Sequence, residues 1–309
     1  MKIIFFGTSD VALPILEALR TQHDIVSVVT APDAKVGRKQ ILTPSPVAQL
    51  ASELGLPTLK PDKVKNNAEF LNQLRALSAD IFIVVSYGKI LPLDLLNIPP
   101  LKTLNVHFSL LPKYRGAAPI QFALLNGETS TGTTIFILDE LLDHGSILAQ
   151  ESAAIEPDDT FLTLSQRLAH QSAKLLLKIL PDYSSGKLTP QEQDHSQATS
   201  TKIISKDDGR VDWTKTAAEI YNQFRALYPW PGIWTTWDGK ILKILDCLPA
   251  QAASDAAPGT VLTGGVVACG GRTSLQIKSL QLEGKNPTPI NEFINGYKNF
   301  IGSKLKPLP

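Results

Sequence analysis

The sequence predicts an α/β fold in two domains: a first domain with a mainly parallel sheet, and a smaller C-terminal β-barrel domain. Three observations lead to this prediction. The 309 residues exceed the usual size of a single domain. Strand-like and helix-like segments alternate in the first part, which is typical of a parallel sheet. Short strands separated by glycine-containing turns fill the last part, as they do in small barrels.

Hydrophobic periodicity predicts the elements of the first part. Apolar runs indicate strands, and apolar residues that recur every three or four positions indicate helices. The run at 81–85 is apolar throughout, as expected of a parallel strand buried on both faces. The predicted strands are 3–6, 25–29, 81–85 and a fourth that ends near His107, and the predicted helices are 11–20, 47–53, 70–77 and 161–180.

A polar segment rich in Ser, Gln, Thr and Asp separates the two parts. We therefore place an interdomain linker at 187–203, between a first domain of residues 1–186 and a second domain of residues 204–309. The second domain is predicted to begin with a helix and to continue as short strands. These elements are expected at 217–227 for the helix and at 233–237, 241–245, 259–262 and 275–280 for the strands.

Charge, cysteine content and hydropathy exclude several classes of function. The net charge of +1 argues against a chain that coats nucleic acid through bulk charge, although it leaves room for a local basic patch. Cys247 and Cys269 stand in no Cys-x-x-Cys spacing and are expected to be small core residues. No run approaches the roughly 18 apolar residues that span a membrane, and none is typical of a signal peptide. We expect a cytoplasmic protein.

Asn105 and His107 give the clearest chemical signal in the chain. Side chains two positions apart on a strand leave the same face, so this amide and this imidazole point together. Such a pair suits chemistry at a carbonyl, because the amide can hold an oxyanion while the imidazole moves a proton. The alternative is a strand end whose polar residues cap loop amides. Asn is unfavourable in strands, which favours the functional interpretation.

Asp143 is the second candidate, although an Asp-x-Gly sequence is usually only a turn. A histidine in acyl transfer generally needs a carboxylate that fixes its tautomer, and Asp143 could serve His107 in this way. Asp139 and Glu140 lie close enough in sequence to compete for the role. His144 could be taken for a metal ligand beside His107, but no further histidine stands at a ligand spacing. We predict no metal site.

Several common motifs are absent, and each absence excludes a function. Gly7-Thr-Ser-Asp10 follows the first strand in place of a Gly-x-Gly-x-x-Gly sequence, so a dinucleotide cofactor is disfavoured. No Gly-x-Ser-x-Gly elbow is present, so a serine acyl-enzyme is not expected. Gly265 and Gly270 have the spacing of a phosphate-binding loop but lack its lysine, and we interpret them as part of a hairpin turn.

The segment 32–46 is long for a loop in a compact α/β domain, and such loops are often functional. It carries Lys35, Arg38 and Lys39, with Asp33 as its only acidic residue. A solvated surface loop is the simpler interpretation. A basic loop beside an active site would also suit a phosphate-rich substrate. The four tryptophans all lie in the C-terminal part, where we expect them to pack in the core.

Together these features resemble the methionyl-tRNA formyltransferase family, over nearly the whole chain. The segments that carry the resemblance are Pro-Ser-Pro-Val at 44–47, Ser-Tyr-Gly at 86–88, Asn-Val-His at 105–107, Ser-Leu-Leu-Pro-Lys-Tyr-Arg-Gly-Ala-Ala-Pro-Ile-Gln at 109–121, Leu-Asp-His-Gly at 142–145, Gly-Arg-Val-Asp-Trp at 209–213 and Tyr-Pro-Trp-Pro at 228–231. Asn-x-His followed by Ser-Leu-Leu-Pro is specific for folate-dependent formyl transfer.

The resemblance implies a Rossmann-like formyltransferase domain followed by an OB-like barrel that contacts tRNA. It implies transfer of the formyl group of 10-formyltetrahydrofolate to the amine of methionyl-initiator tRNA, with Asn105, His107 and Asp143 as catalytic residues. The folate is a co-substrate, and no tightly bound cofactor or metal is expected. His107 either relays the proton of the amine or, when protonated, assists the oxyanion. The folate contacts map to Ser109, Leu110, Leu111 and Pro112.

Arg38 in the basic loop is the residue that we assign to tRNA contact. The expected partners are methionyl-initiator tRNA and formylated folate, with no membrane, and the chain is expected to act as a monomer. His144 stands where the family usually has Thr and could alter titration near Asp143. Phe108 replaces a small residue and could narrow the pocket. A sugar-nucleotide or purine-pathway formyltransferase, or a non-catalytic RNA-binding relative, stays open as an alternative.

Overall fold

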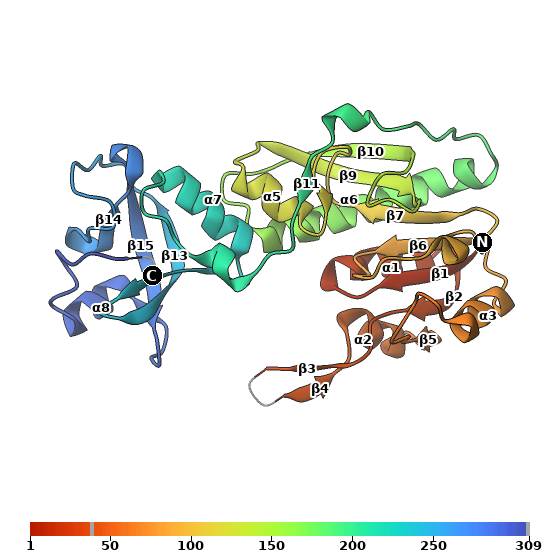
Figure 1. The fold of residues 1–309 in the computed structure, drawn as a ribbon, viewed down its shortest axis with the longest axis horizontal. Coiled ribbons are helices and arrows are strands. Elements are labelled where there is room, and N and C mark those ends of the chain that lie inside the picture. Colours follow the sequence, from red (N-terminus) through yellow and green to blue (C-terminus); the bar gives the residue numbers. More distant parts are fainter. Residues whose placement is uncertain (38–39, 307–309) are drawn as a thin grey trace. The chain divides into compact units, whose positions relative to one another are not determined.

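The computed structural model describes residues 1–37 and 40–306. The chain divides into two compact units. The first unit holds most of residues 1–202. The second unit holds 203–309 together with two short segments from earlier in the chain, 120–129 and 155–164. Figure 1 shows the elements of both units along the sequence. No helix among the residues described is long and apolar enough to cross a membrane.

A seven-stranded sheet forms the centre of the first unit, in the order β10-β9-β7-β6-β1-β2-β5. All neighbours from β7 to β5 pair in parallel, which confirms the mainly parallel sheet. The last two strands, β9 and β10, run antiparallel and were not predicted. The strands are β1 Lys2–Gly7, β2 Asp24–Val29, β5 Thr58–Leu59, β6 Ile81–Val85, β7 Thr103–His107, β9 Ser130–Ile137 and β10 Ile147–Ala154.

Two helices of the first unit, α2 Pro46–Glu53 and α3 Ala68–Ala76, begin at capping side chains. Ser45 accepts a hydrogen bond from the Ala48 amide, and Asn67 accepts one from the Phe70 amide. These helices lie close to their predicted positions, and α1 begins two residues late because a 3-10 turn, η1 Asp10–Ala12, precedes it. The helices are α1 Leu13–Arg20, α2 Pro46–Glu53, α3 Ala68–Ala76, α4 Leu93–Leu96 and α6 Phe161–Ser184.

Alternate residues of the central strands bury a core against α3 and α4. Ile4, Phe6 and Phe82 are completely buried on this face, and the rings of Phe6 and Phe82 lie 5.3 Å apart. Phe70 and Leu74 of α3 complete the cluster. Burial of side chains of this size contributes roughly 1.5–3 kcal/mol each to the free energy of unfolding. The apolar pattern of β1 and β6 therefore fixes the sheet that carries the site.

The long basic loop contains a short antiparallel hairpin, β3 Ala34–Val36 and β4 Ile41–Thr43. Ile41 and Leu42, the first two residues of β4, are exposed. Arg38, which we assigned to tRNA contact, lies outside the residues that the structure describes. That assignment stays a prediction.

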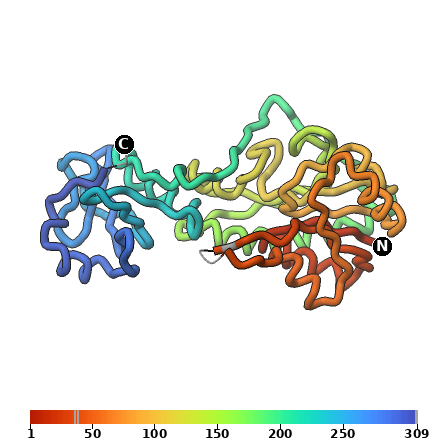
Figure 2. The backbone as a smooth tube through the Cα atoms, turned by 60° about the horizontal axis from the view of Figure 1, so that its bottom comes forward, coloured from red at the N-terminus to blue at the C-terminus, as the bar shows by residue number. Residues whose placement is uncertain are grey.

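The segment 187–203 packs along the first unit. Gln191 and Ile147 exchange backbone hydrogen bonds, and β11 Ser200–Thr201 pairs in parallel with β8 Arg115–Gly116. A 3-10 turn, η2 His195–Gln197, lies between these two contacts. Figure 2 traces the segment in green beyond the end of α6. Residues of this polar segment thus form hydrogen bonds with the first unit, and its role as a linker stays a prediction.

The second unit is built on a five-stranded antiparallel sheet, β12-β13-β15-β14 with β16 on β15. The curled sheet agrees with the implied OB-like domain. Helix α7 has the predicted bounds, because Thr216 and Glu219 form a capping box at its start. The elements are α5 Pro119–Leu125, η3 Lys206–Gly209, α7 Ala217–Leu227, β12 Ile233–Trp237, β13 Lys240–Pro249, η4 Thr263–Gly265, β14 Val266–Ala268, η5 Gly270–Arg272, β15 Ser274–Leu282, β16 Thr288–Pro289 and α8 Ile290–Gly296.

Three expectations for the second unit are wrong. Residues 259–262 form isolated bridges and no regular strand. The segment from Gly265 to Gly270 is no single hairpin turn, because it contains β14, which pairs with β15 further along the chain. Trp230 is 57% exposed and does not belong to the core, whereas Trp213 and Trp237 are buried as predicted. The bridges of Thr260 and Val261 are to Lys304 and Val267, and the partners of β14 lie in β15, so none of these pairings can be read from the local sequence.

Candidate active site

The site lies at the end of β7, where the sheet changes from parallel to antiparallel pairing. Asn105 pairs with Val84 of β6 on one side and with Phe136 of β9 on the other. His107 lies two residues further along the same strand, beside Thr134. Side-chain alternation therefore brings the amide and the imidazole to one face. Asn105 is half-buried and His107 is 6% exposed.

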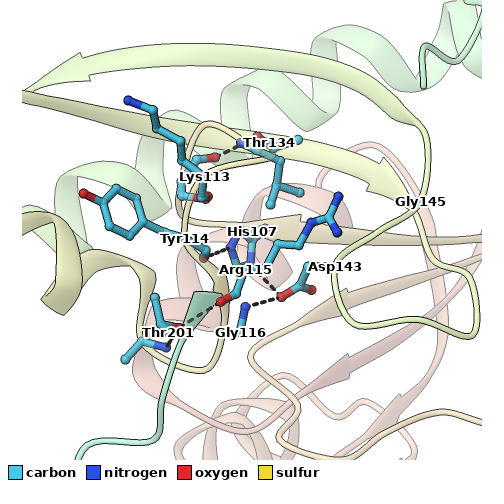
Figure 3. A network of polar contacts seen from close by, with 12 residues as sticks. His107, Lys113, Tyr114, Arg115, Gly116, Thr134, Asp143, Gly145 and Thr201 are labelled. Atoms are coloured by element: carbon cyan, nitrogen blue, oxygen red, sulfur yellow. Dashed lines mark hydrogen bonds and ion pairs between the residues drawn. The ribbon is translucent and has the colours of Figure 1, made fainter. Parts of the chain in front are cut away.

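His107 lies between two acceptors, as Figure 3 shows. Its Nε2 is 2.9 Å from the Tyr114 carbonyl oxygen, and its Nδ1 is 3.7 Å from Asp143 Oδ2. A carbonyl only accepts, so Nε2 carries a hydrogen and donates it. In the neutral ring, Nδ1 is then the unprotonated nitrogen. Protonation at Nδ1 would place the new positive charge beside the carboxylate.

Asp143 is buried and is held by a backbone amide. Its Oδ2 accepts a hydrogen bond of 2.7 Å from the amide of Gly116. Its own backbone is left-handed, with φ of 48°, a conformation that Asp tolerates better than most residues. Gly116 has φ of 108°, and a Cβ there would lie 2.7 Å from the Thr201 carbonyl oxygen. Glycine is therefore needed at the position that donates to the carboxylate.

The structure decides between the three competing acidic residues. Asp139 Oδ2 is bound to His144 Nδ1 at 2.7 Å, and Glu140 is exposed. Of the three, Asp143 is the one whose carboxylate faces His107, with Oδ2 3.7 Å from Nδ1. His144 also stacks on His195, with ring centroids 4.0 Å apart. The side chain of Phe108 is buried.

The turn after β7, predicted to contact folate, is held by β9 and β10. Thr134 Oγ1 donates to the Ser109 carbonyl at 2.7 Å and accepts from the Leu111 amide at 3.0 Å. Gln150 Nε2 donates to the Leu111 carbonyl at 2.8 Å. Leu110 packs against the backbone of Gly132, where a Cβ would lie 2.6 Å from its Cδ2. Side chains from two strands therefore hold the turn in place.

The loop after β6 reaches the same edge of the sheet as the end of β7. Because β6 and β7 are parallel neighbours, their carboxyl ends lie side by side. Ser9 Oγ donates to Ser86 Oγ at 2.7 Å, and Thr8 Oγ1 donates to the Tyr87 carbonyl at 2.9 Å. Burial raises the pKa of Tyr87 to about 12, and its ring packs in the core against Phe6. Tyr87 is therefore a packing residue and a poor proton donor.

Gly145 brings the Asp143 loop into close contact with β9, and this contact is testable. A Cβ at position 145 would lie 1.9 Å from the Ile137 carbonyl oxygen. Gly145→Ala is expected to lower the free energy of unfolding by about 1–3 kcal/mol and to reduce activity, because the loop must shift. Thermal melting and an activity assay measure both effects. Gly296→Ala, where no atom lies within 4 Å, is the matched control. Equal melting temperatures for the two variants would contradict the packing argument.

Comparisons with known proteins identify the family of this chain. The formyl transferase family model matches residues 1–180, and the model of the formyl transferase C-terminal domain matches residues 203–298. The methionyl-tRNA formyltransferase of Acidobacterium capsulatum is 46% identical, with 96% of each chain covered. That of Caldanaerobacter subterraneus is 42% identical, with 99% of this chain and 100% of the relative covered. This chain belongs to the methionyl-tRNA formyltransferase family.

The fold of this formyltransferase is shared with more distant enzymes. The N-formyltransferase from Helicobacter canadensis, solved with folinic acid and dTDP-3-aminofucose, has a TM-score of 0.66 at 19% identity. The similarity covers 90% of this chain and 98% of that structure. At this identity the likeness concerns the fold alone. The family membership rests on the full-length relatives and on both family models.

Sequence reasoning missed the residues that support the formyltransferase site from a distance. Thr134 and Gln150 anchor the turn after β7, and Gln193 donates to the loop of Asp143. None of them lies in a motif with a chemical signature. Gln193 falls inside the predicted linker, where its polarity looked like that of its neighbours. Gln193 is only 5% exposed, and this burial distinguishes it from the neighbouring polar residues.

Proposed function

We propose that this chain formylates the α-amine of methionine esterified to initiator tRNA, with 10-formyltetrahydrofolate as the donor. The observation that carries the proposal is the placement of His107 between the Tyr114 carbonyl and Asp143, on the strand face that also carries Asn105. The full-length methionyl-tRNA formyltransferase relatives support the choice of substrate. Folate is a co-substrate, and no further cofactor is required.

The neutral amine attacks the formyl carbon and gives a tetrahedral intermediate. The carboxamide of Asn105 donates to the developing oxyanion. Nδ1 of His107 takes the proton that the amine loses, because Nε2 already carries the hydrogen that the Tyr114 carbonyl accepts. Asp143, 3.7 Å away, stabilises the resulting imidazolium. The bond to the folate nitrogen then breaks, the imidazolium of His107 returns its proton to that nitrogen, and tetrahydrofolate leaves.

The remaining parts of the proposal concern domains, partners and location. We assign catalysis to residues 1–186, the connection to 187–203 and tRNA contact to 204–309, with Arg38 as a further tRNA contact. The chain acts as a monomer in the cytoplasm, where initiator tRNA is charged. The turn at 109–112 contacts the folate, and its rigid support by Thr134 favours a preformed pocket.

A substrate comparison tests this function. The full chain is incubated with 10-formyltetrahydrofolate and, separately, initiator methionyl-tRNA, elongator methionyl-tRNA and an amino-sugar nucleotide. We expect formylmethionine on the initiator tRNA alone, measured by mass spectrometry after mild base hydrolysis. Formylation of the amino sugar with no product on tRNA would overturn the proposal. Uncharged initiator tRNA controls for transfer to the nucleic acid itself.

A further inference from the structure

We infer that residues 191–201, here called the strap, hold both partners of His107 in place, and that Gln193 is a positioning residue for Asp143. The inference rests on the proposed function. It concerns a segment whose sequence is typical of a linker and which touches neither of the reacting groups. The strap forms one set of contacts with the Asp143 loop and a second set with the segment that contains Tyr114.

Gln193 makes the contacts with the Asp143 loop. Its Nε2 donates to the carbonyl oxygens of Asp143, at 3.0 Å, and Gly145, at 2.8 Å. Its Oε1 accepts from the Arg115 guanidinium at 2.7 Å. One buried carboxamide thus uses both of its N–H groups on the backbone of the loop that presents Asp143. The next residues of the loop are also fixed, because Ile147 exchanges two backbone hydrogen bonds with Gln191.

Thr199 makes the contacts with the segment of Tyr114. Its Oγ1 accepts from the Tyr114 amide at 2.8 Å, and its carbonyl accepts from the Arg115 amide at 2.8 Å. Thr201 Oγ1 then donates to the Arg115 carbonyl at 3.1 Å, a contact drawn in Figure 3. The peptide groups on both sides of the Tyr114 carbonyl are therefore tied to the strap. This carbonyl is the oxygen that accepts from His107 Nε2.

The conformation of the Asp143 loop shows why such support is needed. Asp143 is a non-glycine residue with φ of 48°, and such backbones persist only where surrounding contacts hold them. Without the Gln193 amide, two carbonyl groups of the loop would lose their donor in a buried setting. The loop would then relax, and the carboxylate would move from Nδ1 of His107. The bonds to the strap thus determine the geometry around the imidazole.

Gln193→Glu tests the first set of contacts in the full-length enzyme. The carboxylate keeps the acceptor for Arg115 and removes the donor to the two loop carbonyls. A shift of this loop by about 1 Å is expected to lower kcat about 100-fold with KM for both substrates unchanged, because orientation is lost while binding is kept. Gln197→Glu is the matched control, since Gln197 is exposed and donates only to Asp194. Equal kcat values for the two variants would overturn the inference.

A double-mutant cycle separates positioning from a general loss of structure. If Gln193 acts through the carboxylate, Gln193→Glu should lower kcat little further in the Asp143→Asn background. Independent, multiplicative losses would contradict this. Thr199→Val and Thr199→Ser test the second set of contacts, and only the serine variant should keep wild-type kcat. Wild-type kcat in Thr199→Val would refute the part of the inference that concerns Tyr114. A wild-type enzyme that formylates no methionyl-tRNA would instead refute the proposed function.

Discussion

Replacing His107 by alanine is expected to lower kcat for methionyl-tRNA formylation by about 100- to 10,000-fold, the usual range for a general acid–base residue. The imidazole is the group that can take the proton of the amine while Asp143 faces its Nδ1. His144, which is next to Asp143 in the sequence, is paired with Asp139 and therefore does not replace His107. Single-turnover assays at saturating substrate report the effect on the chemical step directly.

His170→Ala is the control for the His107 variant. His170 lies on the exposed side of α6 and should retain full kcat. Circular dichroism and thermal melting would show that both variants fold. Full activity of a folded His107→Ala enzyme would remove the imidazole from the mechanism. The proposal would then retain only the amide of Asn105 as a chemical group on this strand.

Asn105→Ala is expected to lower kcat about 100- to 1000-fold, which is typical of the loss of one oxyanion donor. The expected effect falls on kcat, since the oxyanion exists only after the amine has attacked. Asn105 lies between two apolar neighbours, Val84 and Phe136, so nothing else at this point of the strand can donate from a side chain. Steady-state kinetics with folate and tRNA varied in turn measure kcat and KM separately.

Kinetic results would distinguish an oxyanion role of Asn105 from a role in folate binding. A rise in KM for folate with unchanged kcat would assign the amide to ground-state binding and contradict the oxyanion role. Asn72→Ala, an exposed asparagine on α3, should change neither constant. Asn105→Asp removes the donor and adds a negative charge beside the oxyanion. We expect it to be slower than the alanine variant.

The local sequence pattern predicted those helices and strands that depend on residues close together in the chain. The alternation of side chains along a strand places Asn105 and His107 on one face before any fold is known. The apolar run at 81–85 predicted β6, and the Thr216–Glu219 capping box accompanies the predicted bounds of α7. The chemistry of an amide beside an imidazole follows from the same pattern. Each of these features depends on residues that lie close together in the sequence.

Long-range contacts account for what the sequence left open. Gly116 donates to a carboxylate 27 residues away, and Gln193 donates to a carbonyl 50 residues away. No local spacing distinguishes Asp143 from Asp139 as the partner of His107, or Gln193 from Gln197 as a buried amide. These choices arise when β8, the loop after β9 and the strap are brought together. Only a folded chain offers the donors and acceptors that decide them.

By itself, the sequence determined the parallel sheet, the family resemblance and the Asn105–His107 pair, because strand periodicity and short motifs are properties of neighbouring residues. The tertiary structure decided which carboxylate reaches the imidazole and which segment supports it. It also showed that the polar stretch after α6 is bonded to the first unit. The physical reason is that a hydrogen bond needs its two groups within about 3 Å, and for distant residues only the fold fixes that distance.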